Sequence, residues 1–388
     1  MAVVNISGAE TGDSSECNAT SGTFSIVSSP TISGGYCYRC NPTTTASGWV
    51  QFGDADLTAI SLNGTLWARC RFRYAAKPSA DDEPIIRFGG VSGTTKLEIR
   101  ITSAGTLAAY DRTDTIITTG STVLAADTTY IIAVRCDDSA TGAWEVKING
   151  VSEISGTNDL STSDHSAVRF GKTNRNDETV DFFFDDIQLN STAYPDNGTV
   201  ARKDASADGT YTAWTIGAGA GSDWENIDDV PHDSDTTYLL STASAGDAQT
   251  ADIETNSSAG INPSTISAAK AVVAMKRTGA ANGIIQVRLR SASTDSDSGD
   301  IATSSVYQGL ALMAETDPAT AVAWTASGLD TVEVGAEERD TDASRMSMAC
   351  LMVDFVAAAA ANRVWQLAPV GTDPADVAGM IHELAGTT

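Results

Sequence analysis

Alternation of apolar and polar residues recurs through the first half of the chain. Along residues 66–74 one face carries Leu66, Ala68, Cys70, Phe72 and Tyr74, and the other carries Trp67, Arg69, Arg71 and Arg73. Residues 96–102 and 130–136 alternate in the same way, and residues 144–148 run into Asn149-Gly150, a strong signal for a tight hairpin turn. Because a period of two is typical of β-strands, these segments predict sheets with one buried face.

The second half repeats this style with different residues. Candidate strands cover residues 237–241, 268–276, 283–290, 306–314, 329–334 and 346–356, separated by loops rich in Gly, Ser and Asp. A length of 388 residues fits two domains, and the loop 191–198, with its Pro and Asn-Gly, marks a boundary. We therefore predict an all-β fold of two β-sandwich (jelly-roll-like) domains, residues 1–195 and 204–356, joined near residues 191–207, followed by a short C-terminal helix.

The last segment, residues 357–388, departs from the β pattern. Thr372-Asp373-Pro374 is a helix start, and the following apolar stripe predicts a helix over about 374–385. A helix this short is marginal alone, so its stripe needs a surface to dock on. We expect an assembly contact, either in a homo-oligomer such as a trimer or with a larger protein assembly on which the segment docks. In the alternative, the segment packs on its own second domain. The residues of this contact are Trp365, Leu367, Val377, Met380, Ile381 and Leu384.

Charge and composition exclude several functions. Lys and Arg number 24 against 50 Asp and Glu, a net charge of −26, which argues against nucleic-acid binding. No stretch approaches the roughly 20 apolar residues of a membrane span. The first residues have neither a basic nor an apolar signal region, so we expect synthesis in a reducing cytoplasm.

Six cysteines invite a search for metal or redox chemistry. Cys37-Tyr-Arg-Cys40 has Cys-x-x-Cys spacing, but in the predicted strand the two side chains point to opposite faces. We expect buried thiols, with a disulfide or a metal site as the alternatives. The three histidines, His165, His232 and His382, belong to no recognisable catalytic motif.

Paired carboxylates occur at Asp185-Asp186 and Asp228-Asp229. Glycosidases need two carboxyl groups about 5–9.5 Å apart across a cleft, which adjacent strand residues do not provide. The acidic loops 81–83 and 295–297 lack EF-hand spacing, so we expect solvated loops, with a calcium site as the alternative. Arg69, Arg71 and Arg73 should meet acidic residues on neighbouring strands; a sugar- or phosphate-binding face is the alternative. We predict no catalytic residue, no cofactor and no required metal.

Several consecutive motifs carry a resemblance to a known superfamily. They are Trp67-Ala-Arg-Cys-Arg-Phe-Arg73, Ile86-Arg-Phe-Gly-Gly90, Leu97-Glu-Ile-Arg-Ile101, Thr129-Tyr-Ile-Ile-Ala-Val-Arg-Cys136, Trp144-Glu-Val-Lys-Ile-Asn-Gly150 and Phe184-Asp-Asp-Ile-Gln-Leu189. Over roughly residues 20–195 the chain resembles a concanavalin A-like, laminin-G-like jelly-roll sandwich. The Glu-x-Asp-x-(x)-Glu strand of the superfamily's glucanases is missing from the sequence, and the calcium loops of its lectins do not map onto it.

The second domain resembles β-rich modules of tailed-phage virion proteins. The motifs are Asp208-Gly-Thr-Tyr-Thr-Ala-Trp214, Trp224-Glu-Asn-Ile-Asp-Asp-Val-Pro231, Asp233-Ser-Asp-Thr-Thr-Tyr238, Asp317-Pro-Ala-Thr-Ala-Val-Ala-Trp-Thr325 and Leu329-Asp-Thr-Val-Glu-Val-Gly335. The resemblance implies a non-enzymatic structural protein on the outside of a bacteriophage virion, made in the host cytoplasm: a capsid decoration or head-fibre protein whose partners are coat or other virion proteins. The alternatives are a tail adhesin that binds a host-surface glycan or receptor, and a secreted glycan hydrolase.

Overall fold

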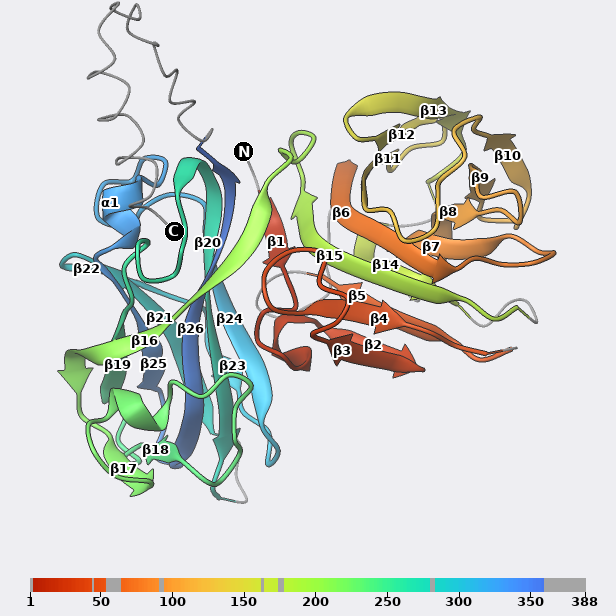
Figure 1. Ribbon diagram of the computed structural model, residues 1–388. Helices are drawn as coiled ribbons and strands as arrows, with labels where there is room; N and C mark the ends of the chain where they lie inside the picture. The colour runs from red at the N-terminus through yellow and green to blue at the C-terminus, as the bar shows by residue number, and fades with distance from the viewer. Residues whose placement is uncertain are drawn as a thin grey trace, which may run out of the picture. The chain divides into compact units, whose positions relative to one another are not determined.

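The computed structural model describes residues 3–43, 45–53, 64–90, 94–161, 164–173, 178–279 and 283–358. Nearly all regular structure in these ranges is antiparallel β-sheet (Figure 1). Helical structure there is confined to short segments such as η1 (Ser14–Glu16), η3 (Trp224–Asn226) and α1 (Ala326–Leu329). The expected all-β fold of jelly-roll-like sandwiches is confirmed. The predicted terminal helix and all six predicted contact residues, Trp365 to Leu384, lie outside the described residues.

Two sheets make the first sandwich. The eight-stranded sheet has the order β13 (Val151–Asn158), β12 (Gly142–Ile148), β11 (Tyr130–Asp137), β6 (Thr65–Ala76), β15 (Asp181–Asn190), β4 (Cys37–Cys40) and β3 (Phe24–Val27), with β1 (Val3–Ser7) paired to β15. The seven-stranded sheet has the order β10 (Ile116–Thr119), β9 (Leu107–Asp111), β8 (Thr95–Ile101), β7 (Glu83–Gly90), β14 (His165–Lys172), β5 (Gly48–Phe52) and β2 (Ala19–Gly22).

The inner faces of these two sheets share one apolar core. Strand β12 shows how the sequence builds it, because its residues alternate between buried and half-buried positions along the whole strand. Phe184 lies at the centre, with its ring centroid 5.4 Å from that of Phe72 and 5.9 Å from that of Phe170 on the opposite sheet. The predicted hairpin is confirmed: Asn149 and Gly150 join β12 to β13 with φ of +51° and +82°.

The second sandwich is built from one eleven-stranded sheet that folds over to make two layers. Its main path runs β17 (Thr215–Ala218), β18 (Tyr238–Leu240), β26 (Ser344–Ala357), β16 (Thr199–Thr212), β19 (Ala248–Ile253), β25 (Val332–Glu338), β21 (Ile284–Ser291) and β22 (Thr294–Asp297). Beside this path, β20 (Pro263–Arg277) pairs with β26 and β24 (Gln308–Ala314), and β23 (Ile301–Ala302) pairs with β21.

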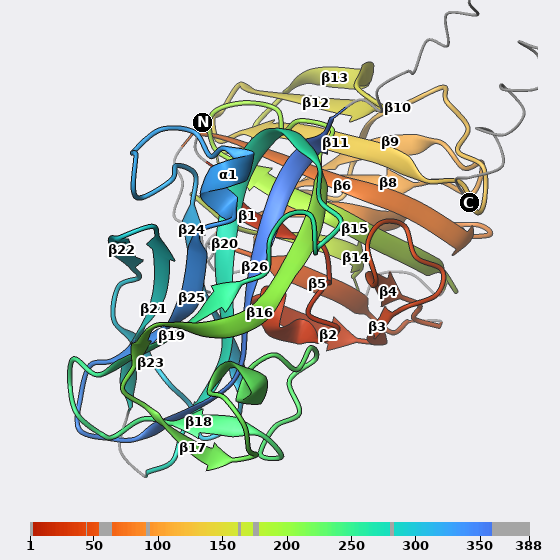
Figure 2. The ribbon, with the colours of Figure 1, turned by 60° about the vertical axis from the view of Figure 1, so that its left-hand side comes forward.

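Strand β16 connects the two layers of this second sandwich. Its first half, Thr199 to Asp204, pairs with β26, and its second half, from Ala205, pairs with β19. In Figures 1 and 2 it is the long green strand that leaves β26 and continues toward β19. Between the two layers lies a core that includes Trp214, Ile227 and Trp324.

A third apolar cluster joins the two sandwiches. Val3 and Ile6 of β1 pack there with residues of β20, β24 and β26, such as Val272 and Met352. Within this interface the fully buried Lys270 donates to Asn5 Oδ1 at 2.9 Å and to the carbonyls of Ile6 and Glu16 at 3.0 and 3.1 Å. Residues 1–357 thus form one compact unit. Residues 191–207, which the sequence predicts to join the two sandwiches, include the start of β16 at Thr199.

Candidate functional site

The outer face of the seven-stranded sheet carries a row of polar side chains. Strand pairing places Gln51 of β5 opposite Arg169 of β14, Arg169 opposite Arg87 of β7, Arg87 opposite Glu98 of β8, and Glu98 opposite Tyr110 of β9. We call Gln51, Arg169, Arg87, Glu98 and Tyr110 the polar row. Since neighbouring strands lie about 4.8 Å apart, the row extends about 19 Å across five strands.

Alternation along each strand puts these residues on the outer face. On β14, Val168 and Phe170 are fully buried in the core, and the intervening Arg169 points the other way. Phe88 of β7 is likewise buried, next to the half-buried Arg87. The same packing that builds the jelly-roll core therefore fixes the polar row.

One end of the row is cationic. Arg169 Nε donates to Gln51 Oε1 at 2.8 Å, and its guanidinium carbon lies 4.3 Å from the ring centroid of Trp49. Partial burial, and then the neighbouring charge of Arg87, lower the pKa of Arg169. Among the described residues no carboxylate contacts Arg169, whereas Arg87 Nε lies 3.7 Å from Glu98 Oε1. The guanidinium groups of Arg169 and Arg87 are thus neighbours at this end of the row.

The other end of the row is internally paired. Glu98 Oε2 accepts from Arg100 Nε and Nη2 at 3.0 and 2.6 Å, and Arg100 also forms an ion pair with Asp114. The Arg100 guanidinium stacks 3.7 Å from the Tyr110 ring centroid. The Tyr110 hydroxyl donates to Asp82 Oδ2 at 2.6 Å, and burial, followed by this hydrogen bond, raises the pKa of Tyr110 to about 12. Tyr110 therefore keeps its proton near neutral pH.

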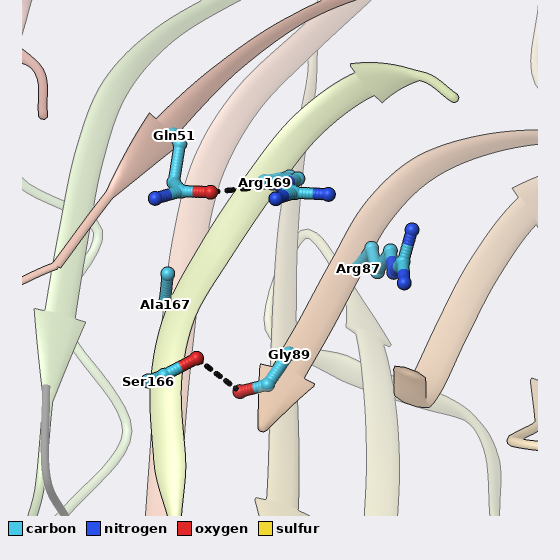
Figure 3. A pocket seen from close by; sticks show the side chains of 6 residues that line it. All are labelled: Gln51, Arg87, Gly89, Ser166, Ala167 and Arg169. Carbon is cyan, nitrogen blue, oxygen red and sulfur yellow. Dashed lines mark hydrogen bonds between the residues drawn. The ribbon is translucent and has the colours of Figure 1, made fainter. Parts of the chain in front are cut away.

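A small hollow opens at the cationic end. It has a volume of about 20 Å³, and its lining residues are Gln51, Arg87, Gly89, Ser166, Ala167 and Arg169. Figure 3 shows the Gln51–Arg169 hydrogen bond beside Arg87, and the Ser166 hydroxyl donating to the Gly89 carbonyl at 3.3 Å. Gly89 and Ala167 are opposite each other in the sheet, so small residues leave the space open. The hollow has room for one water-sized polar group.

The three arginines singled out in the sequence all meet acidic residues, but only Arg71 finds its partner on a neighbouring strand, as predicted. Arg71 forms an ion pair with Asp186, and Arg73 Nη2 lies 2.8 Å from Asp127 Oδ1. Arg69 is fully buried against Asp354 of the second sandwich. The sequence did not indicate this burial, because nothing in the first domain shows which part of its surface the second domain covers.

The cysteines and histidines are largely structural. All six cysteines are free and buried, and Cys37 and Cys40 occupy the two ends of β4, as predicted. His165 is buried with its Nε2 atom 3.1 Å from the Cys136 carbonyl oxygen, and burial lowers its pKa to about 4. His232 is half-buried with Nε2 3.6 Å from Asp13 Oδ2; His382 lies outside the described residues.

The carboxylates of Asp185 and Asp186 accept hydrogen bonds from backbone amide groups. Asp185 Oδ2 accepts from the Ser33 amide at 2.9 Å, and Asp186 Oδ1 accepts from the Val200 amide at 2.7 Å. Burial raises the pKa of both carboxyl groups, and the charge of Asp186 raises that of Asp185 further. In the second pair, burial and then Asp229 raise the pKa of Asp228. These contacts give both carboxylates a structural role: Asp185 holds the loop at Ser33, and Asp186 holds the start of β16.

The acidic loops also have protein partners. Asp82 accepts from Tyr110, and Asp295 and Asp297 pair with Arg290 and Arg288 at 2.5 and 2.6 Å. Across the described ranges, no group of three or more His, Cys, Asp or Glu residues is arranged to hold a metal ion. None of the helices described is long and apolar enough to cross a membrane.

Sequence reasoning missed the polar row. Glu98 and Arg100 were visible as the polar positions of an alternating strand, and Arg87 stood within Ile86-Arg-Phe-Gly-Gly90. Gln51 and Arg169, however, are 118 residues apart, and only strand pairing brings them together. An exposed arginine on an alternating strand was the available signal, and it occurs on many strands of this chain.

Comparisons with known proteins address the fold. No protein-family model and no curated protein matches the chain. Among solved structures, it is similar to the endo-β-1,4-glucuronan lyase from the fungus Trichoderma reesei, with 15% identity and a TM-score of 0.34, over 44% of this chain and 87% of the lyase. It is similar to the Cellulose induced protein Cip1, with 15% identity and a TM-score of 0.36, over 46% of this chain and 90% of that one.

A third similar structure is domain 4 of AbnA, a GH43 extracellular arabinanase from Geobacillus stearothermophilus. The identity is 13% and the TM-score 0.35, over 49% of this chain and 92% of that domain. At such values the likeness assigns no role to any residue of this chain, so the functional argument rests on its own geometry.

Proposed function

We propose that this chain is a non-enzymatic glycan-binding protein whose ligand lies across the polar row. The supporting observation is the row itself: five polar side chains at one level of a sandwich sheet, with the Arg169–Trp49 stack at one end. The arginine and glutamine side chains of the row present planar groups with paired donors or acceptors, which suit the paired hydroxyl groups of sugars. Glu98 is fully buried beneath this surface and is bonded to Arg100. The row's length of about 19 Å suits several linked sugar rings.

The rigidity of the row favours binding. Each of these side chains lies next to a buried residue of its own strand, and hydrogen bonds hold Arg169, Glu98 and Tyr110 in place. A ligand would therefore meet groups that are already oriented, which lowers the entropic cost of binding.

The absence of catalysis is part of this proposal. Tyr110 is protonated and donates to Asp82, and Glu98 is bonded to Arg100, so both groups at this end are already engaged by partners within the protein. The test is incubation of the full chain with a polysaccharide panel, followed by assay of new reducing ends. Release of reducing ends above that of a heat-denatured sample would overturn the non-enzymatic assignment.

A glycan array with the full chain tests the binding itself. We expect retention of at least one glycan class, and the Arg169→Ala variant should weaken it about tenfold by removing charged hydrogen bonds. Arg73→Ala, on the other sheet, is the matched control and should bind like the unchanged protein. If no glycan is retained, or if both variants bind alike, the polar row is not the site.

The outside of a phage virion is the proposed setting. The sequence resemblance of residues 204–356 to virion modules carries this second part, and the free, buried cysteines support synthesis in a reducing host cytoplasm. In this setting the second sandwich and the terminal segment contact coat or other virion proteins, as a capsid decoration or head fibre, and the polar row faces a host-surface glycan. Immunogold electron microscopy of intact particles tests it: label on the capsid supports the proposal, and unlabelled particles contradict it.

A further inference from the structure

Resting on the proposed glycan binding, we infer that the ligand is an acidic sugar whose carboxylate lies against Arg87 and Arg169, with one of its oxygens in the hollow beside them. The hollow lies directly between the row's two guanidinium-bearing strands and is floored by Gly89 and Ala167. The inference narrows the ligand class from glycans in general to those carrying a uronic acid or another carboxylate.

The pairing pattern of the row carries this inference. Arg100 has two carboxylate partners, Glu98 and Asp114, whereas Arg169 has an amide oxygen and an aromatic ring as its partners. Gln51 Oε1 accepts from Arg169 Nε, and among the described residues neither Nη group of Arg169 has an acceptor. A planar guanidinium edge of this kind matches a carboxylate in two parallel hydrogen bonds.

Electrostatic interactions within the row also favour a ligand with a carboxylate. Arg169 and Arg87 are directly opposite on neighbouring strands, and each disfavours the charge of the other. A bound carboxylate would relieve that repulsion, whereas a neutral sugar would leave it in place. The half-buried surroundings strengthen the attraction relative to open solvent.

The charge of the whole chain restricts the ligand further. A net charge of −26 repels a polyanion at long range. The local attraction must therefore come from the hollow, and a short acidic oligosaccharide should bind more readily than a densely charged polymer of the same sugar. At the Tyr110 end, where Asp82 and Asp114 lie, the row suits a neutral sugar unit.

The test compares one ligand with and without its charge. Binding of a glucuronic acid trisaccharide to the full chain is measured by calorimetry beside its carboxyl-reduced counterpart, the glucose trisaccharide of the same linkage. We expect the acidic ligand to bind about tenfold more tightly, and the preference to shrink with added salt.

Gln51→Glu is the decisive variant. It keeps the size of the side chain and puts a carboxylate beside Arg169, so it should weaken binding of the acidic ligand far more than that of the neutral one and abolish the preference between them. Arg169→Gln should do the same by removing the guanidinium group, and Arg73→Gln on the other sheet is the control. Thermal melting of each variant confirms that it is folded.

The outcomes separate the inference from the proposed function. Equal binding of the acidic and neutral ligands refutes the acidic preference and leaves glycan binding standing. Failure of both ligands, together with an empty glycan array, refutes the proposed function as well. An acidic preference that persists in both folded variants, Gln51→Glu and Arg169→Gln, refutes the hollow as its location.

Discussion

Arg69 on β6 and Asp354 on β26 form an ion pair in which neither side chain has any exposed surface. The Arg69 Nη2 atom lies 3.2 Å from Asp354 Oδ1, and the two residues are 285 positions apart in the chain. Arg69 Nε also donates to the Asp186 carbonyl at 3.1 Å, and Nη1 donates to that of Asp196. Burial nevertheless raises the pKa of Asp354 to about 6, against the opposing effect of Arg69. The pair fixes the first sandwich to the second.

Breaking this pair should destabilise the protein strongly. Arg69→Met leaves the Asp354 carboxylate buried with its cation removed, and we expect the free energy of unfolding to fall by about 3–5 kcal/mol. The double variant Arg69→Met/Asp354→Leu removes both charges and should recover most of the loss. Urea unfolding at neutral pH measures both changes; a single variant that loses under about 1 kcal/mol would contradict a structural role for the pair.

Stability should depend on pH through Glu338 of β25. Burial raises the pKa of Glu338 from 4.5 to about 7, and its partner is the Ser241 hydroxyl, which donates at 2.7 Å. The folded state therefore favours the protonated form, and the stability this contributes below pH 4.5 is lost as the pH rises to about 7. Glu338→Gln should raise the free energy of unfolding by about 2 kcal/mol near pH 8 and change it little near pH 4.5.

Glu153 serves as a control because its pKa is shifted in the opposite direction to that of Glu338. Burial raises the pKa of Glu153, but the hydrogen bonds from Thr122 and Ser121 together outweigh it and lower the pKa below its usual value. Its contribution to stability is present above the unfolded pKa and is lost as the pH falls through the folded one. Glu153→Gln should therefore lower stability near pH 8. Melting curves at the two pH values decide the matter: if both variants shift stability in the same direction, the assignment for Glu338 fails.

The six thiols should be inert in the folded protein. Burial raises the pKa of Cys17 and Cys37 to about 12 and that of Cys40, Cys70, Cys136 and Cys350 as well. Since the thiolate is the reactive form, a thiol reagent near pH 8 should label none of them in minutes and all six in denaturant. Mass spectrometry counts the labels. Rapid labelling of a native cysteine would show that its surroundings open locally.

The terminal segment remains the predicted assembly contact. Deleting residues 362–388 removes the apolar stripe of Val377, Met380, Ile381 and Leu384 together with Trp365 and Leu367. We expect the truncated chain to have a smaller oligomeric mass by light scattering and to lose binding to phage particles. An unchanged mass combined with unchanged particle binding would show that this segment does not make the contact.

The sequence by itself determined the type of structure and many of its strands. Alternation over residues 66–74 gave β6, Asn149-Gly150 gave the β12–β13 hairpin, and residues 37–40 gave β4 with its two buried cysteines. These features depend on neighbours within a few residues, because side-chain alternation and turn geometry are local properties of the backbone.

Tertiary structure alone decided which polar residues act together. Arg69, Arg71 and Arg73 have the same pattern in the sequence, yet Arg69 is buried at the sandwich interface and Arg73 pairs with the exposed Asp127. The polar row likewise depends on the register of five strands, with Gln51 and Arg169 brought together over 118 residues. Register and interface are set by the packing of whole sheets, since a shift of one residue would turn every side chain to the other face.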